Sequence, residues 1–449
     1  MRGARRALVA LVALAALAAL APARGAVLLS AAPRAAAVPA PHRASRSAPR
    51  AAAGARAAPD PYELVAEDIA RMKQNLREVA TLNAGPNPTG VAASQPVLTM
   101  AVQEFLKRPG KSFRPMVVLL LGRAAAATAR ARALEGAQTA EVLHAKHMRL
   151  AELTEMMNVA SIIHDDVMDD EVLPAQPDVA HDARNAQDAH RRAHAGAQGG
   201  STARGAQPGA PSADAMPMPV SGVDGNIVHK MYSANVGNKV SILAGDFLLA
   251  RAAVELAQLD DPAVVEIMAG ALESIVRGGM LRSESLAPHE LSVRAYEQRT
   301  QARSAQLLAN SCRCAALLTG YGHTSDEAAA AEAFGCHLGM AAAIAADCRE
   351  FAEGVMRADP QSATLVGAPS VVSLLAAEDR PALLPVVSRQ ARSQADVAEL
   401  VAAVHATGAM DAARRLAAAH AASATAALER FCESDARAAL AGLCQSVLL

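Results

Sequence analysis

Four aspartates in the first half of the sequence are the strongest candidates for chemistry. They lie in the run H-D-D-V-M-D-D as Asp165, Asp166, Asp169 and Asp170. Residues four apart share one face of a helix, so Asp165 lies beside Asp169 and Asp166 beside Asp170. Like charges at this spacing repel, and the carboxylates therefore need a counter-charge. Hard oxygen ligands in such a cluster suit Mg²⁺, which binds through one or two carboxylates and the phosphates of a substrate.

A solvated acidic helix end is the other interpretation of these four residues. The sequence before them argues against it, because Val159 to Ile163 is an apolar run, interrupted by Ser161 alone, that leads directly into the acids. Such a run is typical of a protein interior rather than of a solvated surface. The pattern therefore favours a metal site.

Two cations form a second candidate site. Lys111 and Arg114 lie three residues apart in the segment G-K-S-F-R-P, residues 110–115, just before a predicted helix. Two cations at that spacing can clamp a diphosphate, although a solvated loop explains the same residues equally well. A third element, G-D-F-L-L-A-R at residues 245–251, has a polar Asp246 at the start of an apolar helix.

The composition predicts that helices position these residues. Hydrophobic residues make up 52% of the chain, aromatic residues only 2%, and Trp is absent. Alanine supplies much of the apolar content, and it is the strongest helix former. The net charge of −1 gives no electrostatic reason to expect nucleic acid as a partner. The six cysteines form no C-x-x-C pair, so we interpret most of them as small buried apolar residues.

Hydrophobic periodicity predicts one helical domain in two stretches, residues 60–173 and 226–449. Apolar residues recur at helical spacing from Leu64 to Val79. Further helices are predicted over 96–106, 115–127 and 148–170, and helical patterns resume near Gly237. Residues 174–225 are instead rich in Gly, Ala, Pro, Ser, Gln and His. Such a segment buries too little apolar surface to offset its ordering entropy, so we interpret it as a disordered insertion.

The first 59 residues have the composition of a targeting presequence. They contain no Asp or Glu, and three arginines precede an apolar run over residues 7–21. That run has the length of a signal-peptide core, and the Ala-, Arg-, Ser- and Pro-rich stretch after it is typical of a transit peptide. We expect a plastid leader, with a mitochondrial leader as the alternative. GC-rich coding, which enriches any tail in Ala and Arg, is a further explanation.

Taken together, the motifs resemble those of a known family. The order G-K-x-x-R-P, then L-T-E-M-M-N-V-A-S-I-I-H-D-D-V-M-D-D, then G-N-K-V-S-I-L-A-G-D-F-L-L-A-R-A is similar to the trans-isoprenyl (polyprenyl) diphosphate synthases. The segments D-P-Y-E-L-V-A-E-D-I and Q-P-V-L resemble the plant and cyanobacterial solanesyl branch. The resemblance covers residues 60–173 and 226–449, and it implies an all-α, isoprenoid synthase-type bundle around a central cavity.

The resemblance also implies an activity and roles for individual residues. An allylic diphosphate would lose its diphosphate to Mg²⁺ and cations, and isopentenyl diphosphate would attack the resulting carbocation. Asp165, Asp166 and Asp169 match the ligands of the first Asp-rich motif. Lys111 and Arg114 match the residues that hold isopentenyl diphosphate. The position that limits product length is Ala160, and this small residue implies a long product; close packing of an alanine-rich helix explains it as well.

The segment that matches the second Asp-rich motif departs from the family pattern. It is expected after a helix over 334–340, and the matching stretch is A-D-C-R-E at residues 346–350. Ala346 replaces its first Asp and Glu350 its last, so Asp347 together with Glu350 is left to bind a metal ion more weakly. The lysine-bearing loop that follows in the family is missing. Loss of one ligand from a cooperative set is rarely additive, so we expect reduced activity.

Other substrate-binding positions are changed as well. The isopentenyl-binding His of the family is Asn158, and its Lys-Thr pair is Arg303–Ser304, which keeps a cation although Arg and Lys are not interchangeable. The Gly-Glu-x-x-Gln element reads G-G-M-L-R at residues 278–282, without the acid and the amide. The arginine pair expected after the first motif is absent. Arg191–Arg192 lie in the predicted insertion and substitute only if it folds back.

Two functions follow from these observations. The first is a prenyltransferase that elongates an allylic diphosphate to a long polyprenyl diphosphate for a quinone side chain. The second is a catalytically impaired subunit that tunes the product of an active synthase. The intact first motif favours the enzyme, and the altered second motif favours the subunit. The resemblance further implies a homodimer, or a heterodimer with another prenyl synthase. A long hydrophobic product implies contact with a membrane surface.

Overall fold

The computed structural model describes residues 59–80, 96–107, 112–134, 138–172, 234–283, 291–356, 369–388 and 393–449. Every element within these ranges is a helix, so the predicted all-α class is confirmed. The predicted presequence, apart from its last residue, and the predicted insertion at 174–225 lie outside the described residues.

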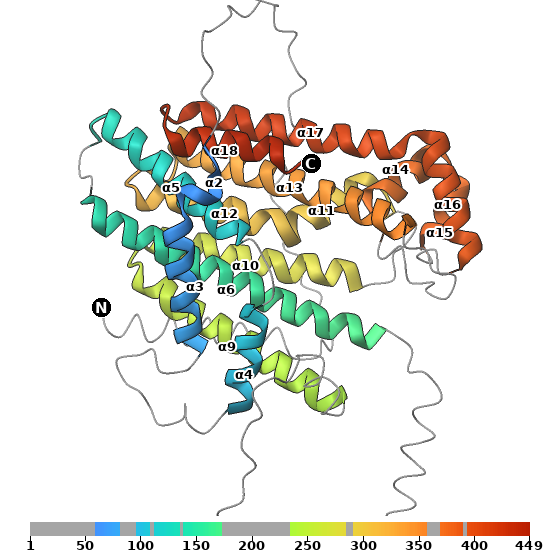
Figure 1. The fold of residues 1–449 in the computed structure, drawn as a ribbon, viewed down its shortest axis with the longest axis horizontal. Coiled ribbons are helices and arrows are strands. Elements are labelled where there is room, and N and C mark those ends of the chain that lie inside the picture. Colours follow the sequence, from blue (N-terminus) through green and yellow to red (C-terminus); the bar gives the residue numbers. More distant parts are fainter. Residues whose placement is uncertain are drawn as a thin grey trace, which may run out of the picture.

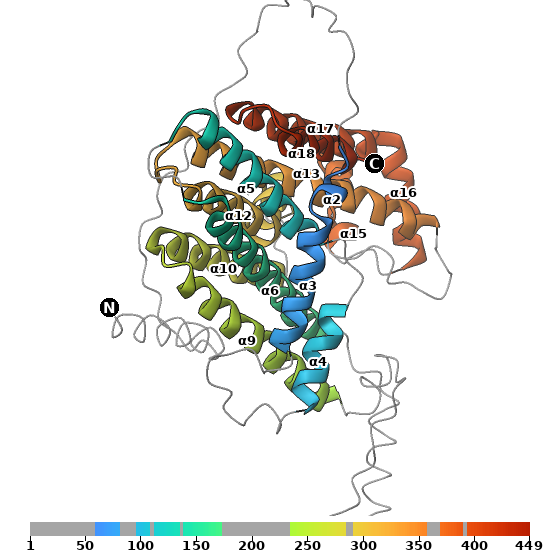
Figure 2. The same ribbon diagram turned by 60° about the vertical axis from the view of Figure 1, so that its left-hand side comes forward.

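Four helices precede the acidic segment: α2 (Pro61–Leu64), α3 (Ala66–Ala80), α4 (Pro96–Lys107) and α5 (Phe113–Ala131). The first starts where the sequence suggests, because Asp60 accepts a hydrogen bond of 2.7 Å from the backbone N–H of Tyr62 and Pro61 follows it. The predictions of helices over 96–106 and 115–127 are confirmed, with α5 starting two residues earlier. Figures 1 and 2 show α3 and α4 lying on one side of the bundle, where α3 crosses α6 and α4 crosses α9.

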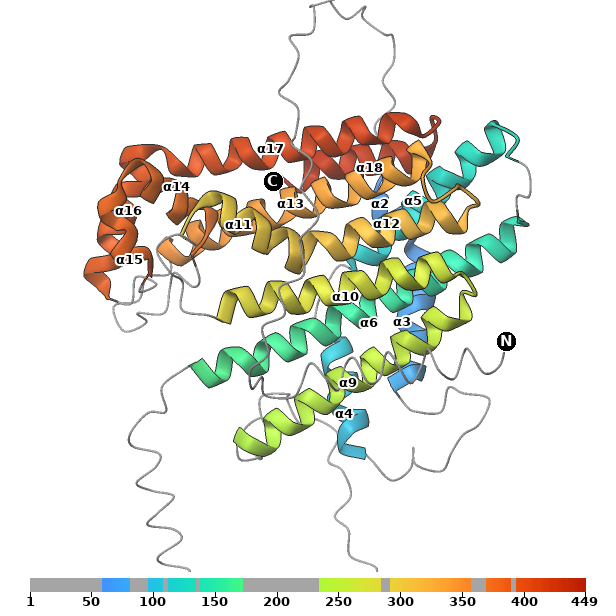
Figure 3. The ribbon, with the colours of Figure 1, turned by 180° about the vertical axis from the view of Figure 1, so that it is seen from behind.

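The long helices run side by side through the molecule (Figures 1 and 3). They are α6 (Ala140–Val172), α9 (Ala234–Gln258), α10 (Pro262–Ser283), α12 (Gln306–Leu318) and α13 (Asp326–Met356). The predicted helix over 148–170 is α6, which begins eight residues earlier. Helix α6, which contains the acidic run, packs on α9. Helix α12 lies between α10 and α13.

A short helical segment of unusual geometry connects α10 to α12. After α11 (Val293–Thr300), the backbone forms a π-helical turn, η3 (Gln301–Ala305). The turn contacts α10, α11, α12 and α13. Wide turns of this kind insert an extra residue into a helix and are frequent at functional sites.

The remaining elements close one end and one side of the bundle. They are α14 (Val371–Asp379), η4 (Pro381–Leu383), α15 (Leu384–Ser388), α16 (Gln394–Thr407), α17 (Ala409–Ala427), η5 (Leu428–Arg430) and α18 (Asp435–Ser446). Serine side chains cap the first turns of α14, α16 and α18. In Figure 1, α14, α15 and α16 gather at one end, and α17 runs along the top edge above α13.

Small residues let the central helices approach closely. A Cβ on Gly339 of α13 would lie 2.8 Å from the Cα of Ala305, and one on Gly335 would lie 2.7 Å from the carbonyl oxygen of Leu308. Helix α17 turns a row of buried alanines inward. The segment Asp326–Gly354 is long and apolar enough to cross a membrane by length and composition, and half of its most apolar window is buried within the protein. Packing against α12 and α17 accounts for this apolar character.

The cysteine prediction is confirmed for most of the six residues. Cys312, Cys314, Cys348 and Cys444 are buried, and Cys336 and Cys432 are half-buried. Burial raises the pKa of the Cys312 and Cys314 thiols above the ordinary value, so both stay protonated at neutral pH.

Candidate active site

The first residue of the acidic run is paired with a cation from the π-helical turn. Asp165 lies near the C-terminal end of α6, and its Oδ2 accepts hydrogen bonds from Arg303 Nη2 at 2.7 Å and from Arg303 Nε at 3.2 Å. The side chains are 25% and 30% exposed, respectively. A charge-assisted pair with two donors on one oxygen is stronger than a neutral hydrogen bond. The fold thus brings together two predicted site residues that are 138 positions apart.

Two glycines of α10 make this pairing sterically feasible. A Cβ on Gly278 would lie 2.8 Å from the backbone nitrogen of Arg303, so a side chain here would push η3 away. A Cβ on Gly279 would lie 3.8 Å from Oδ1 of Asp165. Gly279 stands where the resembling family has a Glu, and its missing side chain leaves one face of the carboxylate without a neighbour from α10.

The histidine before Asp165 ties α6 to α9. Its Nε2 lies 3.3 Å from the carbonyl oxygen of Ile242 and 3.5 Å from Oδ1 of Asp246. A Cβ on Gly245 would lie 2.3 Å from this His164 nitrogen, so only glycine leaves room for the ring. The G-D element that the sequence singled out therefore holds the acidic end of α6 in place.

The other acids of the run lie on the same helix. The backbone of Asp166, Asp169 and Asp170 belongs to α6. Their side chains are outside what the structure describes. Among the described residues, no three His, Cys, Asp or Glu side chains form a group that could hold a metal ion. The metal-binding role of Asp165, Asp166 and Asp169 stays a prediction.

The second candidate site falls partly within the described residues. Lys111 lies outside them. Arg114 is on the first turn of α5, and its buried Nε has no hydrogen-bond partner. Burial lowers the pKa of this guanidinium, and the Glu155 carboxylate of α6 opposes that shift. Conversely, burial raises the pKa of Glu155, while Arg114 and Lys73 lower it. Ten residues separate Glu155 from Asp165 on α6, which is ~15 Å along the helix.

The remaining predicted substrate residues lie on the same elements. Asn158 and Ala160 are on α6, where Asn158 is half-buried and Ala160 is fully buried in the core. Ser304 is half-buried in η3, next to Arg303. The substrate-binding roles of these three residues stay predictions.

The segment matching the second Asp-rich motif lies inside a helix and not after one. The expectation that it follows a helix over 334–340 was wrong, because α13 continues to Met356 without a break. Its alanine-rich sequence from residue 341 to 346 has no residue that ends a helix.

Within α13, Asp347 contacts the end of the bundle where α14 begins. Its Oδ2 accepts a hydrogen bond of 3.1 Å from the backbone N–H of Val371 in α14. Burial raises the pKa of the Asp347 carboxyl, and Glu350 adds to the shift, although Val371 and Tyr296 oppose it. Burial and the neighbouring Asp347 also raise the pKa of the Tyr296 phenol. The contacts of Asp347 thus run to α14 and α11, and its metal role stays a prediction.

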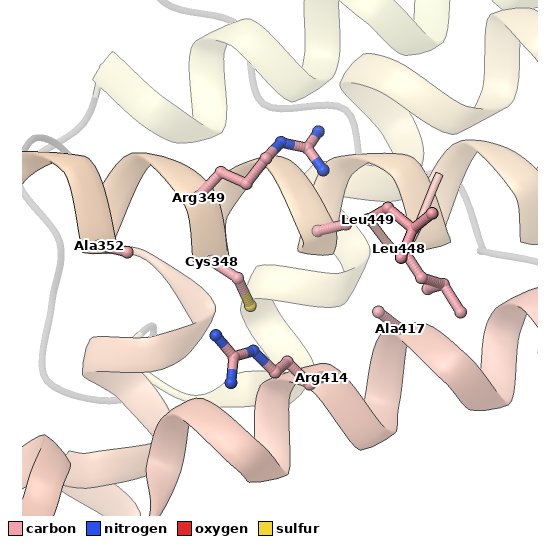
Figure 4. A pocket seen from close by; sticks show the side chains of 8 residues that line it. Cys348, Arg349, Ala352, Arg414, Ala417, Leu448 and Leu449 are labelled. Carbon is pink, nitrogen blue, oxygen red and sulfur yellow. The ribbon is translucent and has the colours of Figure 1, made fainter. Parts of the chain in front are cut away.

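A cleft opens between α13, α17 and the C-terminus (Figure 4). Cys348 and Arg349 come from α13, Arg414 and Ala417 from α17, and Leu448 and Leu449 from the chain end. None of the predicted site residues lines this cleft.

Sequence reasoning missed two contacts at the site. It noted Asp246 as the polar start of an apolar helix but not its approach to His164. It noted the Arg114 cation but not the electrostatic effect of the half-buried Glu155 carboxylate on that guanidinium. One signal was present in the sequence, since a glycine precedes Asp246. Which side chains come together depends on which helices are neighbours, and helical periodicity alone does not give this.

The fold and the site define a helical bundle in which Asp165, near the end of α6, is paired with Arg303 from a neighbouring π-helical turn. The polyprenyl synthetase family model matches residues 95–176 and 227–404. The chain therefore belongs to the polyprenyl synthetase family, and the resemblance seen in the motifs is confirmed.

Curated relatives agree with this assignment. The chain is 31% identical over 344 residues to a mitochondrial solanesyl-diphosphate synthase of Oryza sativa, covering 75% of this chain and 65% of that protein. It is 32% identical over 300 residues to a chloroplastic/mitochondrial solanesyl diphosphate synthase of Arabidopsis thaliana, covering 65% of this chain and 55% of that protein. The chain thus spans less than two thirds of the length of these two relatives.

Solved structures show the same architecture. An apo medium/long-chain length prenyl pyrophosphate synthase of Arabidopsis superposes with a TM-score of 0.56 at 26% identity, covering 87% of this chain and 99% of that chain. A decaprenyl diphosphate synthase of Rhodobacter capsulatus gives a TM-score of 0.59 at 20% identity, covering 86% of this chain and 97% of that chain. Because the Rhodobacter capsulatus enzyme is only 20% identical to this chain, its similarity concerns the fold alone.

Proposed function

We propose that this chain is a trans-prenyltransferase that elongates an allylic diphosphate with isopentenyl diphosphate to a long-chain polyprenyl diphosphate, the precursor of a quinone side chain. The observation that carries the proposal is the pairing of Asp165, in an intact H-D-D-x-x-D run, with Arg303 inside a chain of this family. The names of the relatives, solanesyl and decaprenyl diphosphate synthases among them, support a long product.

The first motif has the chemistry that Mg²⁺ requires. Asp165 is partly exposed, and a Cβ at Gly279 would lie 3.8 Å from its Oδ1, so this position of α10 presents no side chain to the carboxylate. Asp166 and Asp169 follow on the same helix and would complete the ligand set with it. A related polyprenyl synthase from Caulobacter crescentus was solved with calcium and isoprenyl diphosphate, which supports a divalent cation here. When bound, the ion would stabilise the negative charge of the departing diphosphate.

The chain's own residues bind and orient the two substrates in this proposal. Arg303 and Ser304 hold the diphosphate of the allylic substrate beside α6. Lys111, Arg114 and Asn158 hold isopentenyl diphosphate. The unpartnered Nε of Arg114 supports this role, since a buried guanidinium donor without a partner is suited to an incoming anion. Ala160 is a small, fully buried residue at the position that limits product length in the resembling family, which supports a long product.

Asp347 fits a metal site less well. Its half-buried carboxylate accepts a backbone N–H from α14 through Oδ2, so a metal ion would compete with that hydrogen bond for the carboxylate. We derive no step through a second ion. This contact favours the second candidate function, a catalytically impaired subunit of a heteromeric synthase.

The proposal extends to partners and location. Exposed apolar residues on three adjacent helices, namely Ile162, Leu243 and Val276, support a protein partner, either a second copy or another prenyl synthase. A long polyprenyl product supports contact with a membrane surface. The relatives' names place them in chloroplasts or mitochondria, which supports an organelle, and the acid-free leader favours the plastid.

The test is product formation by the purified chain with farnesyl or geranylgeranyl diphosphate, isopentenyl diphosphate and Mg²⁺. A long polyprenyl diphosphate formed by the chain alone supports the enzyme. Product formed only with another synthase of the same organism, and of altered length, supports the subunit. No product under either condition contradicts both.

A further inference from the structure

The pairing of Arg303 with Asp165 has a consequence for metal binding. Two nitrogens of the guanidinium donate to one oxygen of the carboxylate, so Arg303 already supplies the counter-charge that the acidic run requires. The other oxygen, Oδ1, faces Gly279 of α10. A metal ion that binds this carboxylate therefore meets a fixed positive charge on the same group.

We propose that Arg303 acts as a resident cation on Asp165 that opposes binding of a metal ion by itself and favours binding of a metal together with a diphosphate. The proposal deepens the proposed function and rests on it. Two cations on one carboxylate repel, and partial exposure reduces the repulsion without removing it. A bound diphosphate removes this penalty, because its oxygens accept hydrogen bonds from the planar guanidinium and its negative charge attracts both cations.

The local structure supports an exchangeable contact. Arg303 lies in the π-helical turn η3, and its backbone nitrogen is set against Gly278, so the backbone is fixed. Within the described part of the chain, the side chain donates its hydrogen bonds to Asp165. Gly279 leaves space next to the carboxylate into which the guanidinium or a ligand can move. No helix has to shift for the guanidinium to change partners.

A plain structural ion pair is the competing explanation. The two explanations predict opposite changes in metal affinity when Arg303 is removed. If Arg303 only stabilises the end of α6, removing it loosens the acidic run and weakens binding of both the metal and the diphosphate. If it opposes the lone metal, removing it strengthens metal binding and weakens diphosphate binding. One variant therefore separates the two explanations.

The experiment compares the full chain with Arg303→Gln. The affinity for Mn²⁺ alone is measured by electron paramagnetic resonance, and the affinity for inorganic diphosphate at saturating Mg²⁺ by calorimetry. We expect Arg303→Gln to bind Mn²⁺ about three- to tenfold more tightly and diphosphate about tenfold more weakly. Arg303→Lys keeps the charge and is expected to bind Mn²⁺ as the unmodified chain does. Thermal unfolding checks that each variant is folded.

The matched control is Arg277→Gln on α10, because Arg277 is exposed and pairs with Glu273 on its own helix. It is expected to change neither affinity. Unchanged or weakened Mn²⁺ binding in Arg303→Gln overturns the proposal even if the chain makes product. Opposite shifts of the two affinities in a chain that makes no product uphold the proposal and overturn the proposed activity alone.

Discussion

Two long helices of this protein each carry an aspartate of an Asp-rich motif, but the surroundings of these aspartates differ. On α6, Asp165 is a quarter exposed and is held by the side chain of Arg303. On α13, Asp347 is half-buried and is held by the backbone of α14, and desolvation raises the pKa of its carboxyl. A side-chain partner can rotate away in favour of a metal or diphosphate. At Asp347 the carboxylate itself would have to turn away and leave the N–H of Val371 without this acceptor, so Asp165 is the better suited of the two to ligand exchange.

The largest effect is expected at the exchangeable carboxylate. Asp165→Asn removes the charge that pairs with Arg303 and that would hold a metal ion under the proposed function, so we expect product formation to fall more than ~100-fold. Steady-state assays with Mg²⁺ measure this, and thermal unfolding shows whether the fold is intact. The control is Asp411→Asn on α17, because Asp411 is 71% exposed and pairs with Arg414 on its own helix. Equal losses in both variants would contradict the assignment of the site to α6.

The packing role of α13 predicts that a single added methyl group is harmful. Gly339→Ala places a Cβ 2.8 Å from the Cα of Ala305, and we expect a loss of roughly 1–3 kcal/mol in the free energy of unfolding. The control is Gly270→Ala on α10, where a Cβ meets nothing within 4 Å. That variant is expected to gain about 0.5–1 kcal/mol from helix propensity. Chemical denaturation compares the two, and a stabilised Gly339→Ala would show that α13 is not tightly packed.

The pH dependence of stability also distinguishes α13. His337 of α13 and His420 of α17 face each other, with their Nδ1 atoms 3.0 Å apart. Burial, with a smaller effect of His337, lowers the pKa of His420 from 6.5 to about 4. The unfolded chain then binds more protons between these values, so the contribution to stability is present above about pH 6.5 and is lost as the pH falls towards 4.

Comparing the chain with His420→Gln isolates this contribution. We expect the difference in unfolding free energy between the two proteins to change by on the order of 1 kcal/mol from pH 7 to pH 4.5, with the unmodified chain losing more. Thermal or urea unfolding at several pH values measures it. Parallel curves for the two proteins would mean that this histidine is not held neutral in the fold.

The smallest effect is expected at Asp347, the half-buried aspartate of α13. Asp347→Asn keeps an oxygen that can accept the N–H of Val371 and removes a carboxyl whose charged form is disfavoured by burial. We expect product formation to change less than about fivefold, because the contact that it keeps is structural. A loss of product formation as large as that of Asp165→Asn would mean that Asp347 leaves α14 to bind a metal. The proposed difference between the aspartates of α6 and α13 would then be wrong.

The sequence predicted the all-α class, the positions of α4 and α5, and the two aspartates of interest. Helical spacing and alanine content are local properties, so they can be read along the chain. The length of α6 was underestimated, because its first eight residues have no single apolar face. The second motif was expected after a helix end and lies inside α13, because an alanine-rich stretch continues a helix wherever neighbours pack against it.

By itself, the sequence determined which residues carry charge and which of them share a helix face. Only the tertiary structure decided their partners. Arg303 reaches Asp165 across 138 residues because α10 offers two glycines at the crossing, and Asp347 binds the start of α14 because that helix closes the end of the bundle. The physical reason is that the strength and exchangeability of a charge depend on burial and on the nature of its partner, and both arise only when distant helices come together.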